Sequence, residues 1–65
     1  MDFILLKNTR MKRGVTQEQI SKAIGCNEII YSLFEIGLKD PTIEYGMKIK
    51  EYLNLSDDEY QKIFR

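Results

Sequence analysis

Two short helical patterns joined at Gly25 constrain the fold of this chain more than any other feature. They lie between Thr16 and Gly37. Thr16 followed three residues later by Gln19 predicts a capping box at the start of the first pattern. Gly25 adopts positive φ without strain and so suits a tight turn, while Asn27 is a good N-cap for the second pattern. The segment therefore predicts two short helices joined by a turn.

The rest of the chain also divides into short helical pieces, and none shows sustained strand alternation. We expect a helix over residues 2–13, a fourth helix capped by either Asp40 or Thr42, and a fifth helix capped by Ser56. The predicted fold class is all-α, a compact bundle of about five helices. With 65 residues, the chain has room for a single domain spanning residues 1–65.

Helical spacing of apolar residues predicts which side chains face the core. The inward candidates are Phe3, Leu6, Ile20, Ala23, Ile24, Tyr31, Phe34, Ile43, Met47, Ile49 or Lys50, and Leu53. Gly46 lies within the fourth helix, where it costs about 1 kcal/mol relative to Ala. Its presence there predicts the close approach of a neighbouring helix.

Composition excludes several classes of function. The chain has one Cys and no His, which excludes an intrachain disulfide and the common zinc sites. No cofactor, metal or small-molecule site and no enzyme activity are expected, because no nucleophile with a nearby base can be assembled. The longest apolar run is too short to span a membrane, so we expect a reduced, cytoplasmic protein. Cys26 is expected to be a buried, inert thiol, and Asp57, Asp58 and Glu59 to stabilise a helix start.

Charge is distributed unevenly although the formal net charge is zero. Residues 1–39 carry six Lys and Arg against four Asp and Glu, and residues 40–65 carry the reverse. Lys12, Arg13 and Lys22 are expected to be solvated. Any attraction to phosphate would therefore be local to the half that contains the two-helix segment, and sensitive to salt.

From Leu6 to Leu55 the chain resembles the helix-turn-helix domain of lambda-type repressors and Cro, also called the xenobiotic-response-element family. The residues that carry the resemblance are Arg10, Gly14-Val15-Thr16-Gln17-Glu18, Ile20, Ala23, Gly25, Phe34-Glu35, Gly37, Pro41 and Leu53. The resemblance implies a lambda-repressor-like DNA-binding domain whose third helix, at about residues 27–35, enters the major groove. It also implies that Arg10 and Glu35 form a structural salt bridge between the first and third helices.

The resemblance and the chemistry of the side chains together suggest DNA contacts. The candidates for contact with DNA phosphates are Gln17, Asn27 and Lys39. The candidates for contact with bases are Glu28, Ile29, Ser32 and Leu33. For Gln17 a second interpretation stands, that of a solvent-exposed helix former.

The outer face of the third helix is acidic and apolar where family members usually carry polar side chains, and two accounts fit it. In the first, Ile29 and Leu33 pack against thymine methyl groups while Glu28 accepts a hydrogen bond from cytosine. In the second, the face is a protein-docking patch. The residues of that patch would be Ile29, Ile30, Leu33, Ile36 and Leu38.

The resulting prediction is a small transcriptional regulator, similar to phage or mobile-element repressors, that binds operator DNA as a homodimer. The alternative is a protein-interaction module, an antirepressor or a heterodimer partner, that docks through the apolar face of the third helix. A variant whose surface no longer serves its ancestral role also fits the sequence. The candidate dimer or partner contacts, which could instead cover the core of the monomer, are Tyr52, Leu55, Tyr60, Ile63 and Phe64.

Overall fold

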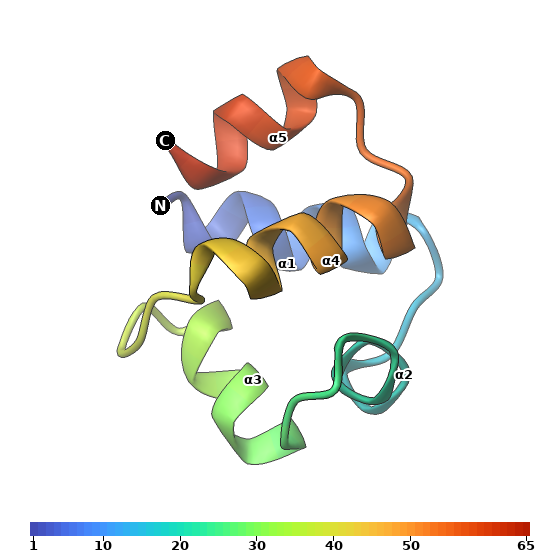
Figure 1. The fold of residues 1–65 in the computed structure, drawn as a ribbon, viewed down its shortest axis with the longest axis vertical. Coiled ribbons are helices and arrows are strands. Elements are labelled where there is room, and N and C mark those ends of the chain that lie inside the picture. The colour runs from blue at the N-terminus through green and yellow to red at the C-terminus, as the bar shows by residue number, and fades with distance from the viewer.

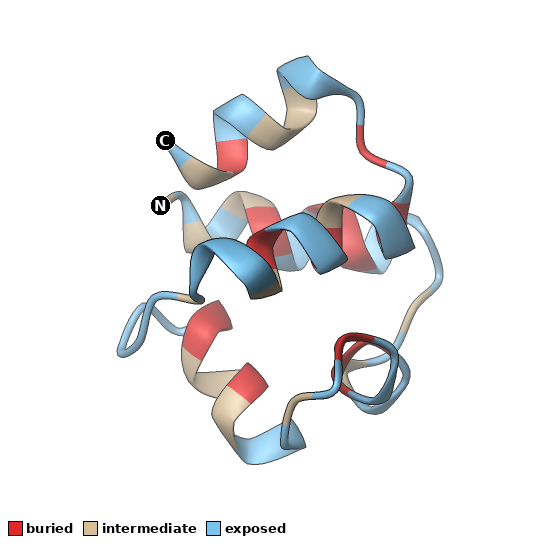
Figure 2. Cartoon of the chain, viewed as in Figure 1, coloured by how far each residue is buried: buried red, intermediate tan, exposed pale blue.

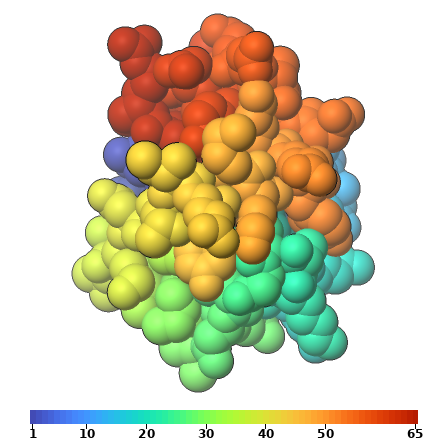
Figure 3. All heavy atoms as spheres, viewed as in Figure 1, coloured from blue at the N-terminus to red at the C-terminus, as the bar shows by residue number.

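The chain folds into five α-helices and no strand, as the sequence predicts. The structure, a computed structural model, describes residues 1–65 in full. In chain order the helices are α1 (Phe3–Lys12), α2 (Gln17–Ile24), α3 (Glu28–Glu35), α4 (Ile43–Leu53) and α5 (Asp57–Phe64). α2 and α3 lie at one end of the molecule and α5 at the other (Figure 1). α4 crosses the face between them, where Figure 3 shows it in yellow to orange.

Side chains near the helix starts fix where the helices begin. Both predicted capping boxes are present, Thr16 with Gln19 at α2 and Ser56 with Glu59 at α5. Each box satisfies two backbone N–H groups that have no partner within the helix. Gly25 ends α2 with φ +74°, which confirms the predicted turn between α2 and α3.

The core lies where the inner faces of all five helices meet, and Figure 2 shows the buried positions on those faces. α2 packs on α3 and α4, while α1 packs on α3 and α5. The core side chains are Leu6, Ile20, Ile24, Tyr31, Phe34, Ile49, Leu53, Leu55 and Ile63. Most of the predicted inward residues are therefore confirmed.

Three predicted core positions are wrong. Ala23, Ile43 and Met47 are exposed, with Ile43 at 83% and Met47 at 51%. For Ile43 and Met47 the reason is the rotation of α4 about its axis, which turns Tyr45 toward α3, whereas Ala23 lies on the solvent side of α2. The ring of Tyr45 lies 6.2 Å from that of Phe34, centroid to centroid. Helical periodicity alone does not fix this rotation, because the contacts that set it come from another helix. Of the two predicted caps of α4, Thr42 is the one used.

α5 approaches α4 closely at Gly46, as the glycine predicts. A Cβ at Gly46 would lie 3.3 Å from the Tyr60 hydroxyl and 3.7 Å from the Phe64 ring. The two rings stack with centroids 4.9 Å apart. Lys50 is half-buried beside them; its ammonium pairs with Asp57 and lies 5.6 Å from the centre of the Tyr60 ring. The absence of a side chain at Gly46 therefore allows α5 to pack this closely on α4.

Arg13 is exposed, as predicted, but it also makes contacts within the chain that were not predicted. Its Nε donates a hydrogen bond to the Leu53 carbonyl oxygen at 2.9 Å, and its Nη2 pairs with Glu59 at 3.1 Å. The side chain thus links the end of α1 to the end of α4 and the start of α5. The sequence offered no local signal for this contact, since the partners lie more than 35 residues away.

Cys26 and the three acidic residues at the start of α5 contact groups that serve the fold. Cys26 is half-buried rather than buried, and burial raises the pKa of its thiol. Asp57 pairs with Lys50, Asp58 pairs with Lys62, and Glu59 completes the capping box. No group of His, Cys, Asp or Glu is arranged to hold a metal ion. None of the helices is long and apolar enough to cross a membrane.

Candidate nucleic-acid interface

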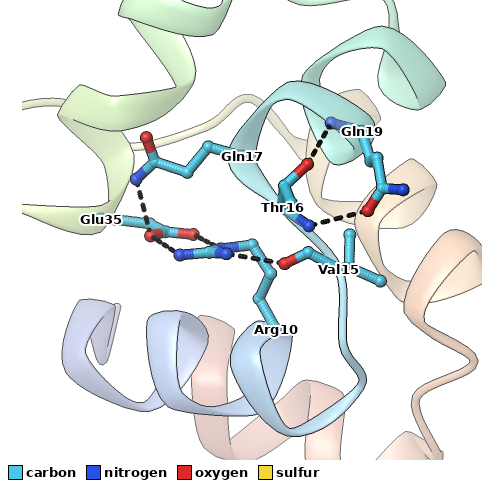
Figure 4. A network of polar contacts seen from close by, with 6 residues as sticks. All are labelled: Arg10, Val15, Thr16, Gln17, Gln19 and Glu35. Atoms are coloured by element: carbon cyan, nitrogen blue, oxygen red, sulfur yellow. Dashed lines mark hydrogen bonds and ion pairs between the residues drawn. The ribbon is translucent and has the colours of Figure 1, made fainter.

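A buried ion pair anchors α3 to the rest of the molecule. Arg10 on α1 donates from Nε to Glu35 Oε2 at 2.6 Å and from Nη2 to Glu35 Oε1 at 3.0 Å (Figure 4). Arg10 also donates from Nη1 to the Val15 carbonyl at 2.7 Å. The side chains are 9% and 1% exposed. The geometry is the bidentate pairing that the planar guanidinium favours, and it ties the end of α3 to α1 and to the entry of α2.

Gln17 joins this network from the first position of α2. Its Nε2 donates to Glu35 Oε1 at 3.0 Å, so the carboxylate accepts from two helices at once (Figure 4). A primary amide has two N–H groups, and the second has no partner within the chain. The side chain is half-buried rather than a free helix former. Glu35 therefore holds the Gln17 amide in place with one donor left over.

The network sets the ionisation of its members. Burial alone would raise the pKa of Glu35, but the hydrogen bonds from Arg10 and Gln17 outweigh burial and hold that pKa below its ordinary value. The hydrogen bonds to Glu35 raise the pKa of Arg10 further. Tyr31 lies beside the pair, fully buried, and its hydroxyl oxygen makes no hydrogen bond. Burial and the neighbouring carboxylate raise the pKa of Tyr31.

The start of α3 is fixed by Asn27. Its Oδ1 accepts from the Ile29 amide at 2.8 Å and from the Ile30 amide at 3.3 Å. Its Nδ2 donors are not used by this cap. Behind the cap, α3 buries Tyr31, Phe34 and Glu35 against α1 and α2. The opposite side of α3 is left to solvent.

That solvent side carries the residues predicted to contact bases. Ile29 is 71% exposed and Glu28 is exposed, whereas Ser32 and Leu33 are half-buried. The Ser32 hydroxyl donates to the Ile29 carbonyl at 2.6 Å. Ile30, which the docking account assigned to the outer patch, is half-buried and packs against the core, so that assignment is wrong. The 3.6-residue period places it on the flank of the helix.

The chain folds back at the end of α3. Gly37, at φ +79°, donates from its N–H to the Phe34 carbonyl, and the Leu38 N–H donates to the Leu33 carbonyl at 3.1 Å. This pair of bonds is a Schellman motif, which typically brings the residue after the glycine against the helix. Leu38 is 75% exposed and Lys39 is exposed. Both therefore lie at the C-terminal end of the exposed face of α3.

All of the predicted DNA-contact residues lie on α2, on α3 and its cap, or in the turn after α3, and α2 and α3 pack on each other at one end of the molecule (Figure 1). They are Gln17, Asn27, Glu28, Ile29, Ser32, Leu33 and Lys39. The predicted dimer residues divide instead. Leu55 and Ile63 are core residues at 6% and 1% exposure and have no surface for a partner. Tyr52 is 43% exposed, while Tyr60 and Phe64 are half-buried. The link from Gln17 to Glu35 was not predicted, since the two are 18 residues apart and no spacing signals it.

Comparison with known proteins agrees with this arrangement. The sequence model of a helix-turn-helix family matches residues 6–60. The chain is 35% identical over 48 residues to a protein of Bacillus subtilis (strain 168) described as the uncharacterized HTH-type transcriptional regulator YqaF. The match covers 74% of this chain and 63% of the relative, so it spans less than two thirds of the relative's length. No solved structure matches the chain.

Proposed function

The chain belongs to the helix-turn-helix family, and from that premise we propose that it is a DNA-binding transcriptional regulator of the repressor and Cro type. The observation that carries the proposal is the arrangement of α2, the turn at Gly25 and α3. α3 is held from behind by the Arg10–Glu35 pair, and its outer side is covered by no other helix. A rigid helix with one free side is what insertion into the major groove requires.

Phosphate contacts are proposed for Gln17, Asn27 and Lys39. Gln17 has an N–H to spare at the N-terminus of α2, where the helix dipole also favours an anion. The Nδ2 group of Asn27 is available at the N-terminus of α3. Lys39 forms no ion pair within the chain. These contacts would position α3 without reading sequence.

Base contacts are proposed for the first turns of α3. Glu28 would accept from cytosine N4, Ser32 would bond to a base edge, and Ile29 and Leu33 would pack on thymine methyl groups. A two-fold homodimer would then read two half-sites about one helical turn apart. The accessible part of the predicted dimer surface is Tyr52, Tyr60 and Phe64.

A titration against a generic duplex tests the proposal. At low salt, fluorescence anisotropy is expected to report binding that weakens as salt rises, because bound cations are released from the phosphates. Replacing Ile29 and Leu33 by Ser is expected to weaken that binding. Absence of binding even at low salt would overturn the proposal.

A second function, protein docking through α3 by an antirepressor or heterodimer partner, is favoured by one observation. Ile29, Ile36 and Leu38 are 71%, 57% and 75% exposed on the side that would read DNA. If this function holds, the Ile29→Ser/Leu33→Ser variant is expected to be more soluble and to lose its protein partner, while the parent chain does not bind the duplex.

A further inference from the structure

The outer side of α3 carries apolar side chains, which we call the α3 patch and define as Ile29, Leu33, Ile36 and Leu38. Three of these side chains are more than half exposed and Leu33 is half-buried. Ile29, Leu33 and Ile36 follow one another at helical spacing, so they form one stripe along the helix. The Schellman bonds place Leu38 beside Leu33 at the end of that stripe. Apolar surface of this kind on a small protein usually marks an interface.

The charges at the two ends of the α3 patch are opposite and unpaired. Glu28 lies at the N-terminal end, and Lys39 follows Leu38 at the C-terminal end. Neither forms an ion pair or a side-chain hydrogen bond within the chain, whereas six other Lys and Arg residues are paired with carboxylates. An elongated apolar stripe with a carboxylate at one end and an ammonium at the other complements its own antiparallel copy.

We infer that two copies of this chain pair through their α3 patches, with the two α3 helices antiparallel about a two-fold axis. In that arrangement Ile29 faces Ile36 of the second copy, and the Leu33 side chains meet near the axis. Glu28 of each copy faces Lys39 of the other, which makes two equivalent ion pairs. The antiparallel helix dipoles also attract. A second copy therefore satisfies both the apolar stripe and the two unpaired charges.

This pairing and DNA binding use the same surface, so they exclude each other. That consequence rests on the proposed function, whereas the self-association does not. One short helix and one turn make a small interface, at the low end of those seen between proteins, so the pairing is weak and concentration-dependent. A weak pairing of this kind keeps the apolar side of α3 out of water when no duplex is bound.

Reversing the charge of Glu28 or Lys39 tests the inference by sedimentation velocity up to about 0.5 mM, without DNA. Every chain, the parent included, carries Tyr52→Lys, so that the proposed dimer surface on α4 and α5 does not contribute to the association. The parent chain is expected to associate, and Glu28→Lys and Lys39→Glu are each expected to associate roughly ten- to thirtyfold more weakly, because two exposed pairs become repulsive. An equimolar mixture of the two variants is expected to recover association, since both cross-pairs are then of opposite sign. Circular dichroism checks that each variant is folded.

A matched control places the same charge change elsewhere. Glu51 is exposed on α4 and unpaired, so Glu51→Lys is expected to associate like the parent chain. The inference is overturned if the parent chain stays monomeric over the whole range. It is also overturned if Glu28→Lys and Lys39→Glu associate as well as the parent chain, which would place the contact elsewhere. A mixture of the two variants that fails to recover association would overturn it too.

A second arm separates this inference from the proposed function. Adding excess duplex at low salt is expected to convert paired copies into DNA complexes. In these complexes the α3 patches no longer contact each other, so neither Glu28→Lys nor Lys39→Glu is expected to affect self-association. If the charge exchange behaves as expected but no duplex binds, the pairing stands and the proposed function fails. If the duplex binds but the exchange has no effect, the proposed function stands and the pairing is wrong.

Discussion

Replacing Glu35 by Gln is expected to destabilise the fold severely. The carboxylate accepts two bonds from Arg10 and one from Gln17, and a carboxamide would present an NH₂ group to donors that need an acceptor. It would also leave the guanidinium, 9% exposed, without its counter-charge. Breaking one side of a buried pair costs roughly 3–5 kcal/mol. A chain of 65 residues has a free energy of unfolding of only about 3–10 kcal/mol, so the loss is a large share of the total.

Urea unfolding followed by circular dichroism measures this loss. Lys22→Gln is the control, because it removes a salt bridge to Glu18 whose side chains are 79% and 64% exposed. The control is expected to cost less than about 0.5 kcal/mol. The double variant Arg10→Met/Glu35→Leu removes both buried charges and is expected to be more stable than Glu35→Gln alone. A loss below 1 kcal/mol for Glu35→Gln would refute the reasoning, as would a double variant less stable than the single one.

The remaining predictions concern pH, backbone and surface charge. The pKa of Glu35 is lower in the folded chain than in the unfolded one, so this carboxylate stabilises the fold fully at pH values above its unfolded pKa of about 4.3. That stabilisation is lost as pH falls through the folded pKa. In Glu35→Gln the free energy of unfolding is therefore expected to depend less on pH than in the parent chain. Gly25→Ala is expected to lower the stability of the fold by about 1 kcal/mol, because the residue has positive φ. Gly37→Ala is expected to lower it more, because the added Cβ would also lie 2.6 Å from the Phe3 ring. Equal losses of stability in thermal unfolding would contradict this. Glu28→Gln is expected to tighten binding to a generic duplex about threefold, which is the effect of removing one charge about 6 Å from a phosphate in water. The control variant Glu51→Gln on α4 is expected to bind like the parent chain in the same anisotropy titration.

Local chemistry explains what could be predicted of the fold. Caps such as Thr16 and Asn27 act on amides two or three residues away, and Gly25 ends a helix by its own backbone conformation. These features are written in consecutive residues, so the five helices follow from the sequence. The Arg10–Glu35 pair is non-local and came from the family resemblance rather than from spacing.

What the sequence missed depends on how helices rotate against each other. Met47 has the right spacing for the core but is exposed, because contacts to α2, α3 and α5 set the orientation of α4. Likewise, whether Tyr60 and Phe64 served the core or a partner depended on where α5 packs. For the DNA-contact residues, the sequence predicted which ones share a surface, but not that Gln17 is already held by Glu35.

The central claim is that α3 and the N-terminus of α2 form the surface that meets DNA. Amide chemical shifts of the ¹⁵N-labelled chain, recorded during addition of a generic duplex at low salt, test it most directly. The account predicts that the largest changes fall on Gln17, on residues 27–36 and on Lys39, with only smaller changes at the proposed dimer residues Tyr60 and Phe64 of α5. Changes centred on residues 57–64, or no change at all, would contradict it.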